Sequence, residues 1–134
     1  MPTIKSSYLG NLRTESEHVH SGVKILSDAP VDNNGKGEAF SPTDLVASAL
    51  GSCMVTIMGI VANRDSVSLE GMTWEVTKIM QASPRKISEI IVDFHWANPV
   101  NDAAMIQKLK NAAITCPVAL SLDPEIKQTL NFDF

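Results

Sequence analysis

Two cysteines are the residues of this sequence best suited to chemistry. Cys53 lies within the apolar stretch 41–62, and Cys116 stands directly before a proline. A thiolate is a nucleophile that can be oxidised, so this pair is consistent with redox chemistry. A lone cysteine on an apolar helix is, however, more often inert packing, because free cysteine is among the most buried residue types. On the residues alone, both interpretations stay open.

The two thiols would be activated in different ways. Cys116 is predicted at the start of a short helix, where outward-pointing N–H groups favour an anion. Cys53 is predicted in the middle of a helix and has no such help. A cation from elsewhere in the fold would have to stabilise its thiolate.

Arginine is the cation that stays charged when partly buried, and the sequence contains three of them. Arg64 suits the C-terminus of the predicted helix and Arg85 a hairpin turn, which leaves Arg13 without a local structural role. Arg13 could also simply pair with Glu15 or Glu17 on a solvated strand. Its role in activating a thiol is therefore a hypothesis.

The segment 41–62, SPTDLVASALGSCMVTIMGIVA, is predicted to be a buried helix. Ser41 suits the N-cap, Pro42 the first helical position and Asp44 the capping-box position, so Asp44 is a cap first and a catalytic candidate second. The helix is apolar on every face and must be enclosed on several sides. A membrane span is the less favoured alternative, because small and hydroxyl residues interrupt the run and no anchoring residues flank it.

The rest of the sequence predicts strands around this helix. Alternating apolar residues predict strands at 72–80 and 90–96, joined through 82–86, and a third strand within 126–134. A hairpin of strands 8–17 and 22–27 should precede the helix, followed by a long loop, 28–38. Asn101 can cap a helix over 102–113, and a last helical turn should begin near Cys116. The predicted fold class is α+β, in one domain over 1–134.

Composition excludes several classes of function. The net charge of −4, with 11 scattered basic residues, predicts no nucleic-acid or membrane partner. The N-terminus has no signal-peptide pattern, which predicts a cytoplasmic protein with reduced thiols. His18, His20 and His95 have no metal-ligand spacing with each other or with the cysteines, and no nucleotide-binding motif is present, so neither metal nor cofactor is expected.

The blocks SPTDLVASALGSC and ITCPVALSL, about sixty residues apart, resemble the OsmC/Ohr family of osmotically inducible and organic hydroperoxide resistance proteins. The likeness spans nearly the whole chain, including LRTESEHVHSG and GKGEAFSP. It implies an OsmC-like fold: an intertwined α+β homodimer whose two long central helices are wrapped by antiparallel sheets. This agrees with the apolar helix, which one small sheet cannot cover.

The resemblance also implies a peroxiredoxin-like thiol peroxidase of the oxidative stress response, acting on organic hydroperoxides. Cys53 falls on the peroxidatic position of the family and Cys116 on the resolving position, so a Cys53–Cys116 disulfide would form. An external dithiol, of lipoyl type for example, would reduce it. The alternative is a non-catalytic dimer of the same fold that binds a small apolar ligand.

The sequence departs from the hydroperoxide-resistance branch at one position. That branch has an acidic residue ten positions before the peroxidatic cysteine, where this sequence has Thr43, with Asp44 one step later. One step on a helix is a rotation of about 100°. Arg13 is the candidate for the activating arginine of the family, because it alone lies in the N-terminal strands.

Overall fold

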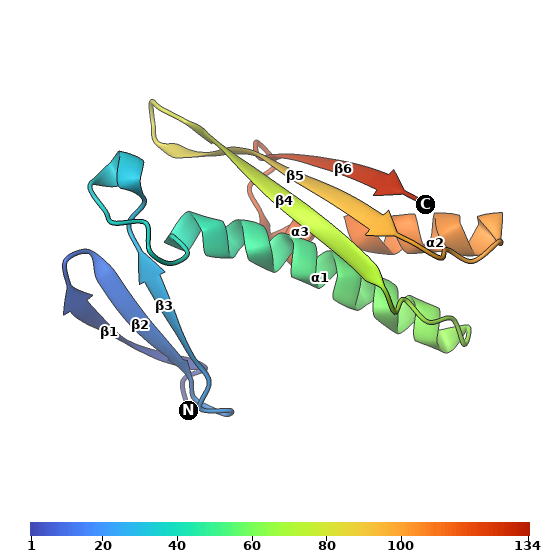
Figure 1. The fold of residues 1–134 in the computed structure, drawn as a ribbon, viewed down its shortest axis with the longest axis horizontal. Helices are drawn as coiled ribbons and strands as arrows, with labels where there is room; N and C mark the ends of the chain where they lie inside the picture. The colour runs from blue at the N-terminus through green and yellow to red at the C-terminus, as the bar shows by residue number, and fades with distance from the viewer. The chain divides into compact units, whose positions relative to one another are not determined.

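The computed structural model describes residues 1–134 as two compact units, 1–46 and 47–134. Figure 1 shows their elements in chain order. The mixture of helices and separate sheets confirms the predicted α+β class. That the whole chain forms one domain stays a prediction.

The first unit is a three-stranded antiparallel sheet followed by a loop and the start of a helix. Its strands are β1 (Ile4–Gly10), β2 (Arg13–His18) and β3 (Lys24–Asp28), in the order β1-β2-β3. The loop holds a short 3-10 turn, η1 (Val31–Asn33).

The prediction of a single strand over 8–17 is wrong. Gly10, Asn11 and Leu12 all have positive φ angles, of 86°, 54° and 62°, and they turn the chain between β1 and β2. Glycine and asparagine adopt this conformation readily, but leucine does so rarely, so only Gly10 and Asn11 indicated a turn here.

The second unit pairs a sheet with helices on one side of it (Figure 1). Strands β4 (Met72–Gln81) and β5 (Lys86–Trp96) form the predicted antiparallel hairpin, and β5 begins earlier than expected. β6 (Lys127–Asp133) pairs with β5 in parallel, so this sheet is not wholly antiparallel. The parallel pairing follows from the crossover through α2 (Ala103–Ile114) and α3 (Pro117–Ser121).

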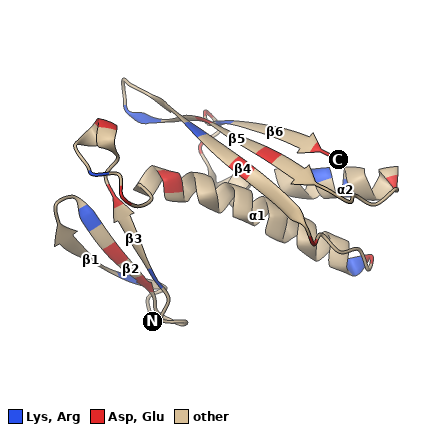
Figure 2. Ribbon diagram, in the orientation of Figure 1, with Lys and Arg blue, Asp and Glu red and all other residues tan.

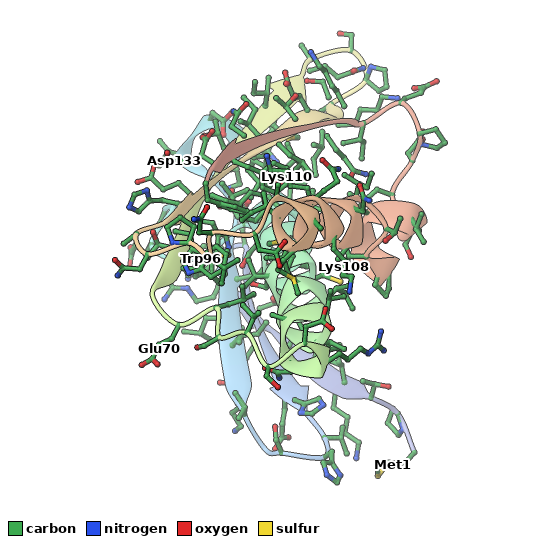
Figure 3. The ribbon with its side chains drawn as sticks, turned by 90° about the vertical axis from the view of Figure 1, so that its right-hand side faces the viewer. Met1, Glu70, Trp96, Lys108, Lys110 and Asp133 are labelled. Carbon is green, nitrogen blue, oxygen red and sulfur yellow. The ribbon has the colours of Figure 1, made fainter.

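The sheet and helices of the second unit enclose a core. On β5 the predicted alternation is confirmed, because Ile90, Val92, Phe94 and Trp96 are all buried. Phe94 stacks on Phe132 of β6 at 4.9 Å between ring centroids. Nζ of Lys110 in α2 lies 5.5 Å from the centre of the Phe132 ring of β6 (Figure 3).

The N-cap of α2 is Asp102, whose side chain accepts hydrogen bonds from two backbone N–H groups. This corrects the prediction of Asn101 as the cap.

The long predicted helix is α1 (Pro42–Arg64), and it carries no charge between Asp44 and Arg64 (Figure 2). By length and composition alone it could cross a membrane. One stripe of it is buried within the chain: Ala47, Leu50, Gly51, Met54, Met58 and Ala62. The remaining apolar side chains are half-buried or exposed, so a single chain does not enclose this helix on several sides.

Gly51 brings α1 close to β4. A Cβ atom there would lie 2.9 Å from Nε1 of Trp74 and 3.0 Å from Cγ2 of Val76. Gly59, on the same helix, offers a matched comparison, because its Cβ would meet nothing closer than a Leu69 methyl at 4.0 Å.

We therefore expect Gly51→Ala and Gly59→Ala to change stability in opposite directions. Overpacking costs about 1–3 kcal/mol, more than the gain of up to about 1 kcal/mol from the better helix former, so Gly51→Ala should destabilise. Gly59→Ala should stabilise by about 0.5–1 kcal/mol. Urea unfolding of both variants measures the difference, and shifts of the same sign would contradict the packing argument.

Candidate active site

Cys53 lies on α1, between the buried stripe and the open face of the helix. Its side chain is half-buried, whereas Met54 beside it is fully buried. The thiol therefore stays accessible to a small molecule within an apolar surface. This placement follows from the helix start, which sets where each side chain points.

The helix start is a capping box. The backbone N–H of Ser41 donates to Oδ2 of Asp44 at 2.9 Å, and the N–H of Asp44 donates to Oγ of Ser41 at 3.1 Å. The prediction of Ser41 as N-cap and Asp44 as its partner is confirmed. Thr43, ten positions before Cys53, shares a hydrogen bond with the Ser41 hydroxyl at 3.2 Å. Both residues serve the helix start.

Cys116 is the N-cap of α3, as predicted, with Pro117 at the first helical position. Its side chain is completely buried. The backbone N–H of Ala119 donates to its sulfur at 3.4 Å. A five-residue helix has few hydrogen bonds of its own, so contacts from neighbouring elements hold this turn in place.

The structure brings the two thiols together. Cys53 is close enough to Cys116 to raise the pKa of its thiol, and both are free thiols. Residues 63 positions apart in the sequence thus meet because α1 and the α2–α3 segment belong to the same unit. A close, unbonded approach of two thiols is the arrangement from which a disulfide can form after one sulfur is oxidised.

The environment of Cys116 differs from the sequence-based expectation. Burial raises the pKa of its thiol, the N–H groups of Ala119 and Val118 lower it, and the neighbouring Cys53 raises it further. The balance is a raised pKa, because desolvation of the thiolate outweighs the donors at the helix start. Cys116 is therefore a thiol rather than a thiolate at neutral pH.

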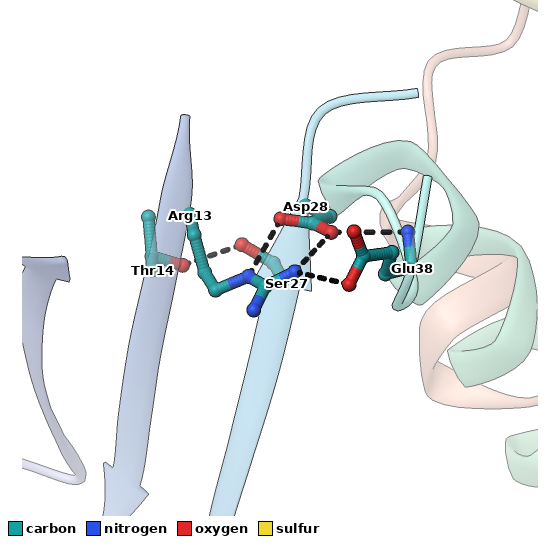
Figure 4. A network of polar contacts seen from close by, with 5 residues as sticks. All are labelled: Arg13, Thr14, Ser27, Asp28 and Glu38. Carbon is teal, nitrogen blue, oxygen red and sulfur yellow. Dashed lines mark hydrogen bonds and ion pairs between the residues drawn. The ribbon is translucent and has the colours of Figure 1, made fainter. Parts of the chain in front are cut away.

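Arg13 is held by two carboxylates (Figure 4). Its Nε and Nη2 donate to the two oxygens of Asp28 at 2.9 and 2.8 Å, and Nη2 also contacts Glu38 at 3.3 Å. The predicted alternative, a pairing with Glu15 or Glu17, is wrong. Glu15 instead lies 3.7 Å from Lys24 of β3.

Asp28 is the important residue that sequence reasoning missed. Its side chain is only 2% exposed, and its Oδ2 also accepts from the backbone N–H of Glu38 at 3.0 Å. Hydrogen bonding by Arg13 lowers its pKa, although burial opposes this. Because the pKa is lowered in the folded state, the ionised carboxylate stabilises the fold above its ordinary pKa. That contribution is lost as the pH falls through the lowered value.

The loop 28–38 brings Glu38 back to Asp28, and a glycine makes this possible. The N–H of Asp28 donates to the carbonyl of Phe40 at 2.9 Å, which closes the loop. A Cβ at Gly35 would lie 1.7 Å from the carbonyl oxygen of Ala29, so only glycine fits. The glycines were the signal that this loop is folded, but they did not identify which acid meets Arg13.

Two sets of candidate residues thus emerge. Cys53 and Cys116 meet in the second unit, while Arg13, Asp28 and Glu38 meet in the first. The described chain has no group of three or more His, Cys, Asp or Glu residues that could hold a metal ion. The two sets supply a pair of thiols and a carboxylate-bound arginine.

Residues 35–131 match the family model described as OsmC-like protein. The chain belongs to this family. It is 47% identical to a protein from Psychrobacter arcticus 273-4, provisionally named an osmotic stress induced and detoxification response protein. That crystal structure superposes with a TM-score of 0.94, covering 98% of this chain and 96% of the other.

More distant OsmC-like structures share the fold. An organic hydroperoxide resistance protein OsmC from Legionella pneumophila is 20% identical, with a TM-score of 0.76 over 100% of this chain and 98% of that one. An OsmC-like protein from Mycoplasma pneumoniae is 16% identical, with a TM-score of 0.75 over 96% and 93% of the two chains. Comparison with curated proteins gives no match.

Proposed function

We propose that this OsmC-like protein is a thiol-dependent peroxidase that reduces organic hydroperoxides, with Cys53 as the peroxidatic and Cys116 as the resolving cysteine. The observation that carries the proposal is the close, unbonded approach of a half-buried and a fully buried thiol. The exposure of the two thiols fits the order of the steps. Only Cys53 is accessible to a substrate, whereas Cys116 is buried and can react only with the oxidised Cys53.

The proposed reaction has three steps. The Cys53 thiolate attacks the distal oxygen of the hydroperoxide, the O–O bond breaks, and the alkoxide leaves as an alcohol after taking a proton. Cys53 is thereby oxidised to a sulfenic acid. The Cys116 thiol loses its proton and attacks the Cys53 sulfur, the S–O bond breaks, the hydroxide takes up a proton and leaves as water, and a disulfide forms. An external dithiol reduces this disulfide by exchange and becomes a disulfide itself. We place the reaction in the cytoplasm, where such reductants keep thiols reduced.

The surroundings of Cys53 favour an alkyl hydroperoxide as substrate. α1 carries no charge from Leu45 to Asn63, and the side chains on its open face are mostly apolar. Burying an alkyl group against such a surface contributes about 0.8 kcal/mol per CH₂. Hydrogen peroxide has no alkyl group and gains nothing from it. The name of the Legionella relative refers to the same class of compound.

Peroxide consumption in the presence of a dithiol tests the proposal. Cumene hydroperoxide should be consumed at least about tenfold faster than hydrogen peroxide, since two or three buried CH₂ groups are worth that factor. Cys53→Ser should abolish turnover, and Cys116→Ser should allow one turnover with a dimedone-reactive Cys53. If no hydroperoxide is consumed while an apolar probe still binds, the alternative of a non-catalytic binding protein holds.

We further propose that Arg13 stabilises the Cys53 thiolate. Its guanidinium stays charged, because the hydrogen bonds with Asp28 and Glu38 raise its pKa. The bidentate pairing with Asp28 also fixes the plane of the guanidinium, so its remaining N–H groups are held in a set direction. Asp44 remains a weaker candidate, since its carboxylate caps α1.

Alkylation of Cys53 in a Cys116→Ser background tests this role. Arg13→Ala should slow alkylation at pH 7 by about tenfold or more and move its profile to higher pH, because an opposite charge at close range favours the thiolate. Asp28→Asn should have a smaller effect in the same direction. Arg85→Ala is the matched control and should leave the profile unchanged. Coincident profiles for Arg13→Ala and its parent would contradict the proposal.

The proposed enzyme is a homodimer, and two features of the chain support this. The apolar face of α1 is left partly open, with Ile60 45% exposed. In the first unit the buried side chains are all polar, namely Ser27, Asp28 and Ser41, while most of its large apolar side chains are exposed. A three-stranded sheet without an apolar core is not stable alone. A second copy of the chain would cover both surfaces.

Such a dimer should show an unfolding midpoint that rises with protein concentration, because dissociation accompanies unfolding. Ile60→Asp should dissociate it, since a charge on the open face of α1 would be buried in the interface. Analytical ultracentrifugation at micromolar concentration measures the oligomeric state of the unmodified protein and of Ile60→Asp. A folded monomer of the unmodified chain would exclude the obligate dimer.

A further inference from the structure

Gln128 is a polar residue in an apolar row. On β6 it alternates with Leu130 and Phe132, and in the sheet it lies opposite Ile90, which is fully buried. Residues paired across neighbouring strands point to the same face, so the amide of Gln128 lies on the covered face of the sheet. An amide in such a place requires hydrogen-bond partners.

The partner of Gln128 lies next to the candidate resolving cysteine. Its Nε2 donates to the carbonyl oxygen of Ala119 in α3 at 3.0 Å. Ala119 in turn donates its backbone N–H to the sulfur of Cys116 at 3.4 Å. One residue of a five-residue helix is thus held from β6 on one side and bonded to the thiol on the other.

We infer that Gln128 is a positioning residue for the resolving step. By fixing Ala119, it keeps the N–H of this residue aimed at the Cys116 sulfur while that sulfur loses its proton and attacks the Cys53 sulfenic acid. The inference rests on the proposed function. It extends that function to a residue whose hydrogen bond goes to Ala119 and not to either thiol.

The chemistry of the resolving step explains why one N–H matters. Cys116 is buried, so desolvation opposes its ionisation, and the N–H groups of Ala119 and Val118 are the donors that favour the thiolate. Loss of one aligned donor raises the pH at which the thiolate forms. The first step uses Cys53 and not Cys116, so it should not respond.

Single-turnover kinetics of Gln128→Met separate the two steps. Methionine has a similar length but cannot donate to Ala119. Oxidation by one equivalent of cumene hydroperoxide should proceed at the unmodified rate. Disulfide formation should slow about tenfold at pH 7, with its pH profile moved to higher pH. Asn131→Leu is the control, because it removes an amide hydrogen bond of the same strand, to Asp93 on the exposed side, and should change neither step.

A second measurement needs no catalysis. In a Cys53→Ser background, Gln128→Met should raise the pH at which the Cys116 thiolate forms, as followed by the ultraviolet absorbance of the thiolate. A misfolded variant would expose Cys116 to water and lower that pH, so the two explanations predict shifts in opposite directions. An unmodified rate of disulfide formation in Gln128→Met would overturn the inference alone. Absence of a disulfide in the unmodified protein after oxidation would overturn the proposed function and the inference with it.

Discussion

The structure depends on a helix that is too apolar for one chain to cover. α1 runs without a charge through most of its length, and only one stripe of it is buried within the chain. The close approach at Gly51 lets β4 sit tightly on that stripe. Everything else on the helix, including the half-buried Cys53, is left at a partly open apolar surface. These uncovered apolar side chains favour burial against a second copy of the chain, and they also provide surroundings suited to an alkyl substrate.

The two thiols illustrate how burial and reactivity oppose each other. Full burial protects Cys116 from external oxidants but raises its pKa, which slows the step it would perform. Backbone N–H groups at the start of α3 offset part of this rise in pKa. One of them belongs to Ala119, whose carbonyl oxygen accepts a hydrogen bond from the amide of Gln128. A short helix anchored by a strand can thereby present a buried sulfur in one defined direction.

The N-terminal unit is organised by polar contacts instead of an apolar core. Arg13 joins β2 to the end of β3 and to the loop, and hydroxyl groups of Thr14 and Ser27 bond across the same strands (Figure 4). A buried carboxylate is tolerated there because a guanidinium and a backbone N–H satisfy it. This unit gains rigidity at Arg13 but exposes most of its large apolar side chains, a combination that suits a surface to be covered by a second chain.

The sequence by itself determined the elements whose causes are local. The capping box at Ser41 and Asp44, the apolar alternation on β5 and the helix start at Cys116 depend on neighbouring residues, and each was predictable. The family followed from two cysteine-containing blocks. The turn through Leu12 was missed, because its left-handed conformation runs against the preference of leucine.

Only the tertiary structure decided which distant residues meet. Cys53 and Cys116 approach each other because they belong to helices of one unit. Arg13 pairs with Asp28, and not with Glu15, which is nearer in the sequence, because Arg13 and Asp28 lie directly opposite each other on β2 and β3. The raised pKa of Cys116 likewise depends on burial by residues far away in the sequence. Local patterns encode secondary structure, whereas electrostatics and desolvation depend on the packed surroundings.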